Sequence, residues 1–201
     1  MGRYRGPKHK LSRREGKDLF GTGGESLQRR LDRPPGQHGP NRRPRRESEY
    51  SKQLREKQKV KRMYGMREKQ FQRFYLQADK KRGQTGINLL TLLERRLDNV
   101  VYRLGFARSR PQARQFVSHG LVYVNGQRVN IPSYLVSPGE TITMKETLLK
   151  IPDVQELAEG KPIVPGWLER REDGGTVIRE PERIEIDPDI EEQRIVEFYS
   201  R

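Results

Sequence analysis

Three arginines stand near the beginning of a short predicted helix, in positions where they could bind an anion. Arg110 and Arg114 are one helical turn apart, so their side chains share a face, and Arg108 precedes them. Ser109 has the N-cap position, and Gln112, three residues further on, completes the spacing of a capping box. The positive end of the helix dipole lies at the same end. Because a guanidinium group can bind two phosphate oxygens at once, we predict a compact phosphate site here.

The stretch around these arginines predicts helices followed by small strands. Leucine and valine residues recur along one side of residues 88–105, which predicts a helix ending near Gly105. The arginine-bearing helix follows and ends at Gly120. Residues 121–124 then predict a strand, and a Pro-Gly turn precedes another strand at 141–144. Two short helices and a few antiparallel strands therefore position the arginines.

A hairpin turn is the clearest local signal in this region. Asn125-Gly126 is typical of a type I′ turn, in which both central residues take a positive φ. Polar side chains on the hairpin could add contacts to a sugar–phosphate backbone. These candidates are Asn125, Gln127 and Arg128.

A second basic group lies in the proline-free stretch 47–82, which predicts two helices separated at Gly65, with Ser48 as the first N-cap. Residues 51–83 hold 12 basic and 3 acidic side chains, a net charge of +9. Solvated helices usually mix the two signs, so this excess favours phosphate contact over a merely solvated face. The candidate residues are Arg55, Lys57, Lys59, Lys61 and Arg62.

The first 46 residues are rich in glycine, proline and basic residues, and they predict an extended arm with short helical turns at most. Scattered apolar residues, such as Leu19 and Leu27, favour ordering on a partner over a disordered tail. The candidate contact residues of the arm are Arg3, Tyr4, Lys8, Lys10, Arg13, Arg14, Arg42, Arg43, Arg45 and Arg46.

The composition of the whole chain also indicates a polyanionic partner. The 201 residues carry a net charge of +15, and only 31% are hydrophobic, against about 45–50% in ordinary domains. Basic proteins gain affinity for nucleic acids by displacing counterions from phosphates. Residues 131–201 are the exception, with 9 basic and 16 acidic side chains and a net charge of −7. We therefore expect the nucleic-acid contacts in the first 130 residues, and a solvent face or a basic neighbour for the rest.

Other classes of protein are disfavoured by what the sequence lacks. No apolar run approaches the roughly 18 residues of a membrane-spanning helix, and the N-terminus has charges without the apolar core of a secretory signal. The chain has no cysteine, which excludes disulfides and thiolate metal sites and fits a reducing compartment.

Several strings in this sequence resemble a known family. The stretches RRLDNVVYRLGFARSRPQARQFVSHG and VNGQRVNIPSYLVSPGE resemble the S4 RNA-binding module, a small α/β unit shared by ribosomal proteins, RNA-modifying enzymes and one class of tRNA synthetase. The resemblance then extends along nearly the whole chain, through GRYRGP, LSRREG, PGQHG, LREKQKVKRMYG and the ending IVEFYSR. Together these ordered matches are similar to the bacterial family of small-subunit ribosomal protein S4.

The resemblance implies an α+β fold, with a mainly helical domain into which the small RNA-binding module is inserted, and an extended N-terminal arm. The implied domains are the arm at 1–46, a helical domain at 47–88 plus 187–201, and the module with an irregular acidic extension at 89–186. A final helix is predicted from Asp187 as N-cap to Tyr199. In this arrangement Ile190, Ile195 and Val196 would pack on the helices before the module.

The functional implication is a structural constituent of the small ribosomal subunit. Members of the family bind 16S ribosomal RNA early, nucleate assembly of the body of the subunit and contribute to translational accuracy. The implied partners are 16S rRNA, the neighbouring proteins S5 and S12, and mRNA near the channel by which it enters the ribosome, where Arg42, Arg43, Arg45 and Arg46 would lie. The implied location is the ribosome of the cytoplasm or of an organelle, with no membrane.

This sequence departs from one pattern in the family. Some members hold a zinc ion with four cysteines in the arm, but here His9 and Ser12 stand where the first two would fall. A structural zinc site needs four good ligands, and the three histidines are scattered. We therefore expect no metal and no other cofactor.

Three alternatives share parts of this pattern. An RNA-modifying enzyme would need a catalytic domain, for which too little sequence remains, and no nucleophile or acid–base pair surrounds the histidines. Heat-shock and rescue factors with the module are short and lack the arm and the helical domain. A DNA-binding protein would need a long recognition helix for the major groove, whereas compact basic surfaces suit RNA better. We therefore predict a non-enzymatic rRNA-binding protein.

Overall fold

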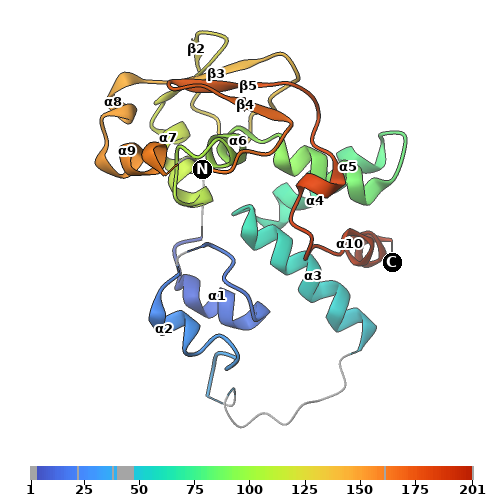
Figure 1. Ribbon diagram of the computed structural model, residues 1–201. Coiled ribbons are helices and arrows are strands. Elements are labelled where there is room, and N and C mark those ends of the chain that lie inside the picture. Colours follow the sequence, from blue (N-terminus) through green and yellow to red (C-terminus); the bar gives the residue numbers. More distant parts are fainter. Residues whose placement is uncertain (1–3, 22, 38, 40–47, 161, 201) are drawn as a thin grey trace. The chain divides into compact units, whose positions relative to one another are not determined.

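The computed structural model describes residues 4–21, 23–37, 39, 48–160 and 162–200. The architecture is α+β, with a five-stranded antiparallel sheet and α-helices throughout (Figure 1). The chain divides into two compact units: Met1–Arg73 with Asp189–Arg201, and Phe74–Pro188. We call them the first and second units. No helix in the described ranges is long and apolar enough to cross a membrane.

The boundary between the units falls inside a helix, α4 (Glu68–Asp79). The expected division into arm, helical domain and module rests on the family resemblance and stays a prediction.

The first unit is built on α3 (Glu49–Met63). The predicted N-cap is confirmed, because the Ser48 hydroxyl accepts a hydrogen bond from the Ser51 amide at 3.2 Å. The predicted break at Gly65 is also confirmed: this residue has a φ of 60°, a left-handed conformation that favours glycine, and α4 begins just after it.

The N-terminal segment contains more helix than the sequence predicted. Helix α1 (Lys8–Glu15) has two full turns and is followed by the short α2 (Glu25–Gln28). The carboxylate of Glu15 is buried between the guanidinium groups of Arg55 and Arg62 on α3. The prediction of an extended arm was therefore wrong for these residues, because ion pairs within the chain order α1 against α3.

The C-terminal helix α10 (Glu192–Tyr199) completes the first unit by packing on α3. Ile195 and Ile190 are buried, and the Gln53 amide donates to the Glu197 carboxylate at 2.9 Å. The helix begins later than predicted, with Glu191 and not Asp187 at its N-cap. The residues before it are held by α3 in another way: the Asp189 carbonyl accepts from the Lys59 ammonium group at 2.6 Å.

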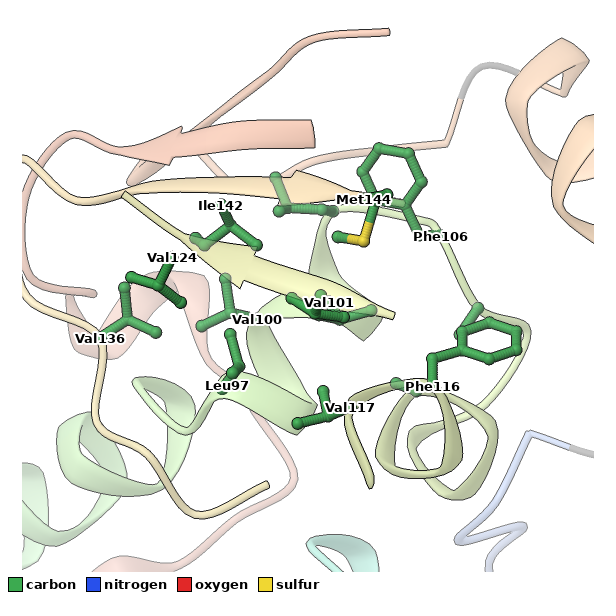
Figure 2. Close-up of a cluster of buried hydrophobic side chains, with 14 of the residues drawn as sticks. Leu97, Val100, Val101, Phe106, Phe116, Val117, Val124, Val136, Ile142 and Met144 are labelled. Atoms are coloured by element: carbon green, nitrogen blue, oxygen red, sulfur yellow. The ribbon is translucent and has the colours of Figure 1, made fainter. Parts of the chain in front are cut away.

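The second unit places helices against one face of the sheet, whose strand order is β2-β1-β3-β5-β4. Figure 2 shows valines 100 and 101 and Val117 from the helices meeting Val124 and Ile142 from the strands. The strands are β1 (Val122–Val124), β2 (Gln127–Arg128), β3 (Thr141–Met144), β4 (Leu168–Arg170) and β5 (Gly174–Val177). The helices are α5 (Thr85–Glu94), α6 (Leu97–Arg103), α7 (Arg110–Ser118), α8 (Glu146–Leu149) and α9 (Pro152–Glu159).

One detail of this unit differs from the sequence-based expectation. The single helix predicted over 88–105 is interrupted, because Arg96 takes an extended conformation (ψ 134°) and forms an isolated β-bridge with Leu135. After the strands, Glu182 and Glu185 form a reciprocal capping box around a 3-10 helix, η1 (Arg183–Glu185). The type I′ turn is confirmed by the positive φ of Asn125 and Gly126, 49° and 77°.

Glu68 joins three parts of the first unit. Its carboxylate accepts hydrogen bonds from Lys57 at 2.8 Å, Lys61 at 2.7 Å and the Tyr199 hydroxyl at 2.9 Å. Burial acts to raise the pKa of Glu68, but these three hydrogen bonds outweigh it and lower the pKa to about 2. The Lys57 ammonium group is itself buried and lies 4.4 Å from the centre of the Phe198 ring.

Replacing Glu68 with glutamine should lower the free energy of unfolding at pH 7 by about 1–2 kcal/mol, because Lys57 loses its carboxylate. The folded pKa of about 2 lies below the ordinary 4.5, so the carboxylate stabilises the fold above pH 4.5 and this contribution is lost as the pH falls through about 2. The gap between wild type and Glu68→Gln, measured by urea unfolding, should therefore shrink from pH 4.5 to 2. A gap that persists at pH 2 would contradict this, and Glu159→Gln, an exposed carboxylate on α9, is the control.

Candidate nucleic-acid interface

The five basic residues predicted on α3 all form ion pairs within the first unit. Glu15 pairs with Arg55 at 3.2 Å and also with Arg62, while Glu68 pairs with both Lys57 and Lys61. The Lys59 ammonium group lies 2.8 Å from the Glu56 carboxylate. These side chains therefore hold α3 to its neighbours, and the excess positive charge of the stretch resides mainly elsewhere.

Exposed cations that the sequence analysis did not single out lie on α4 and on either side of it. Their side chains form no ion pair with any described residue. They are Arg67, Lys69 and Arg73 in the first unit, and Lys80, Lys81 and Arg82 in the second. The signal was available, because Phe71, Phe74 and Ala78 define the buried face of α4 and the helical period then turns Lys69 and Arg73 outward.

Of the three arginines predicted to form the phosphate site, Arg108 is the exposed one. Its side chain is 53% exposed and pairs with Glu156 on α9, which is 69% exposed. An ion pair this open to solvent contributes little stability, so an RNA phosphate could readily take the place of Glu156. Arg108 lies just before α7, where the chain enters the helix.

Arg110 and Arg114 lie on α7 as predicted, but they are mostly covered and paired inside the second unit. The Arg110 guanidinium donates to the Asn99 side-chain oxygen at 2.7 Å and stacks over the Tyr102 ring, 4.7 Å from its centre. Arg114 donates to the Asp98 carboxylate at 3.3 Å. The predicted compact site therefore consists of one open arginine beside two whose positions are fixed by α6.

The predicted capping box at the start of α7 is not formed. Ser109 is at the N-cap position but its side chain accepts no capping hydrogen bond. The Gln112 side-chain oxygen instead accepts from the Arg108 amide at 2.8 Å, and its amide nitrogen lies 3.5 Å from Asp153 on α9. Gln112 thus fixes the backbone that carries Arg108.

Two of the predicted hairpin residues form hydrogen bonds within the chain, and the third is exposed. The Arg128 guanidinium donates to the Gly120 and His119 carbonyls at 2.9 and 3.1 Å, so it caps the end of α7. Gly120 has a φ of 67°, and a Cβ there would lie 2.2 Å from the Arg128 side chain. Asn125 accepts from the Thr141 amide at 2.9 Å, while Gln127 is exposed.

Some of the predicted contact residues of the N-terminal arm are exposed, and others form contacts within the chain. Tyr4, Lys8, Lys10 and Arg14 are exposed, and the Lys8 ammonium group lies 5.6 Å from the centre of the Phe20 ring. Arg13 donates to the carbonyls of Arg33 at 2.9 Å and Pro34 at 3.3 Å. The other predicted arm contacts lie outside the described residues: Arg3, Arg42, Arg43, Arg45 and Arg46.

No metal-binding group was found where the structure describes the chain, since no three histidine, aspartate or glutamate side chains there are gathered to hold an ion. His9 and His119 are both exposed. The second unit presents exposed Arg108 beside Arg110 and Arg114, whose side chains are held in place, and exposed polar side chains on the hairpin. Further exposed cations lie on α4 and on either side of it. Such a set can bind phosphate groups.

Comparisons with known proteins place this geometry in a family. Residues 3–94 match the model of the ribosomal protein S4/S9 N-terminal domain, and residues 95–142 match that of the S4 domain. Curated relatives are named small ribosomal subunit protein uS4. The protein from Natranaerobius thermophilus is 54% identical over 211 residues, that from Variovorax paradoxus 53% over 209, and that from Geobacillus stearothermophilus 52% over 205, in each case covering 100% of both chains. The chain belongs to the ribosomal protein uS4 family of the small ribosomal subunit.

Proposed function

We propose that this protein is a structural, non-enzymatic constituent of the small ribosomal subunit that binds 16S rRNA directly. The family assignment supports the ribosomal role. The observation that carries RNA contact is the start of α7, where exposed Arg108 stands beside Arg110 and Arg114, both held in fixed positions, within the part of the chain that matches the S4 domain. Basic residues arranged in this way bind a sugar–phosphate backbone through charge and shape.

Within the ribosome, we assign the protein the family's place as an early rRNA-binding protein. It would nucleate assembly of the subunit body and contribute to translational accuracy in the cytoplasm. Its protein neighbours would be S5 and S12, and residues of the arm would lie near incoming mRNA. The acidic stretch 131–201 supports a protein neighbour, because its net charge of −7 complements a basic ribosomal protein and repels RNA.

The proposal predicts that the purified full-length chain prefers 16S 5′-domain RNA to duplex DNA of equal length. Filter binding at several salt concentrations measures this preference, because the non-specific part of the affinity falls steeply with salt while shape-specific contacts persist. Equal or stronger binding to DNA would defeat the proposal. Turnover in a uridine-modification or aminoacylation assay with the same preparation would defeat its non-enzymatic part.

Arg108 should contribute to RNA binding and not to stability. Arg108→Ala is expected to reduce the slope of log affinity against log salt by about one, because one phosphate contact is lost. It should change the free energy of unfolding by less than about 0.5 kcal/mol, since its ion pair is exposed. In the matched variant Arg114→Ala, unfolding should become easier by about 1–3 kcal/mol, because Asp98 loses a partner. A salt slope unchanged by Arg108→Ala would remove this residue from the interface.

A further inference from the structure

Four arginines surround two carboxylates where α5, α6 and α7 meet in the second unit. Glu94 ends α5, Asp98 lies in the first turn of α6, and the arginines come from α6, α7 and the residue before α6. The four are Arg96, Arg103, Arg110 and Arg114. Their charges leave this cluster with an excess of +2, four positive against two negative.

Glu94 fixes two of the arginines. Its carboxylate accepts from Arg103 twice, at 2.8 and 2.9 Å, and from the Asn99 amide at 2.8 Å. The Asn99 oxygen in turn accepts from Arg110 at 2.7 Å, and one Arg110 nitrogen lies 3.9 Å from Glu94 itself. Tyr102 covers one face of that guanidinium. Arg110 is therefore held directly by Asn99 and Tyr102, and indirectly by Glu94.

Asp98 holds the other two arginines in the same manner. It accepts from Arg96 at 3.0 and 2.6 Å, and from Arg114 at 3.3 Å. The Arg96 side chain is fully buried over the Phe74 ring, and its Nη1 atom has no hydrogen-bond partner. Arg96 is thus an internal support, whereas Arg114 reaches the surface.

The two signs of charge lie at different depths. The side chains of Glu94 and Asp98 are 1% and 6% exposed, whereas those of Arg103, Arg110 and Arg114 are 21%, 15% and 12% exposed. An approaching polyanion therefore meets guanidinium groups and not carboxylates. The partly exposed guanidinium groups of Arg103, Arg110 and Arg114 can therefore donate hydrogen bonds to phosphate oxygens.

We propose that Glu94 and Asp98 are positioning residues for RNA binding: they hold Arg103, Arg110 and Arg114 in place before the RNA arrives. This rests on the proposed function, because the arginines are positioned for rRNA phosphates. Without the carboxylates, the arginine side chains would adopt orientations that miss the phosphates, so that contacts would be lost and affinity would fall by about three- to tenfold per arginine.

The two explanations predict opposite changes in RNA affinity when Glu94 is replaced by glutamine. Glu94→Gln removes a negative charge from a basic surface, so long-range electrostatics alone would tighten RNA binding. Positioning predicts the opposite, that Glu94→Gln weakens binding to 16S 5′-domain RNA by at least about threefold and lowers the salt slope by about one. The control is Glu156→Gln, which removes the exposed carboxylate beside Arg108 and should bind as tightly as wild type or more tightly.

Equal or tighter binding by Glu94→Gln, in a protein that still unfolds cooperatively, would overturn the positioning role. Weaker binding with an unchanged salt slope would also overturn it, because that result indicates a merely structural effect. If Glu94→Gln does not fold, Tyr102→Leu decides, since it keeps every charge and removes the ring that stacks on Arg110: weaker binding supports positioning and unchanged binding refutes it. Failure of the wild-type chain to bind the RNA would instead refute the proposed function.

Discussion

Four carboxylates in the described part of this chain each bind two cationic side chains, and both compact units are built around such groups. Glu15 and Glu68 do this in the first unit, and Glu94 and Asp98 do it in the second. A chain with a net charge of +15 and 31% hydrophobic residues cannot rely on apolar burial alone. Sharing each carboxylate between two cations reduces repulsion among the basic side chains and ties together segments far apart in the sequence.

This sharing decides which cations are available to a nucleic acid. The basic residues of α3 support the helical unit, and burial raises the pKa of Glu15 despite the two arginines beside it. The cations most open to solvent are Arg108 and the exposed residues of α4 and its flanks, while Arg103, Arg110 and Arg114 are partly exposed and held by carboxylates. An ion pair with a carboxylate therefore does not by itself make a basic residue structural: the pairs of α3 join helices of the first unit, whereas Glu94 and Asp98 pair with partly exposed arginines.

Local features were predictable from the sequence because their causes are local. The Ser48 cap, the break at Gly65 and the Asn125-Gly126 turn each depend on one or two residues with strong backbone preferences. The family and the α+β architecture were also predictable, because the matching strings are spread along the chain.

The partners of the charged residues were not predictable, because they depend on tertiary distance. Glu15 meets Arg55 across 40 residues of sequence, and Glu68 meets Tyr199 across 131. For the same reason the residues of α1 were predicted to be extended. The capping box predicted from the spacing of Ser109 and Gln112 does not form, because Gln112 accepts from the Arg108 amide instead. The short helices α8 and α9 each contribute one fully buried residue, Leu148 and Val154, to the hydrophobic core of the second unit, which is too weak a pattern to predict them.

We infer that the surface around α7 and the hairpin binds rRNA while the acidic C-terminal third does not. Crosslinking of purified small subunits, with the crosslinked peptides identified by mass spectrometry, would locate these contacts. We predict RNA crosslinks at residues 103–128 and on the exposed cations of α4, with protein–protein crosslinks dominating residues 131–201. RNA crosslinks confined to residues 131–201, with none at Arg108 or its neighbours, would contradict it.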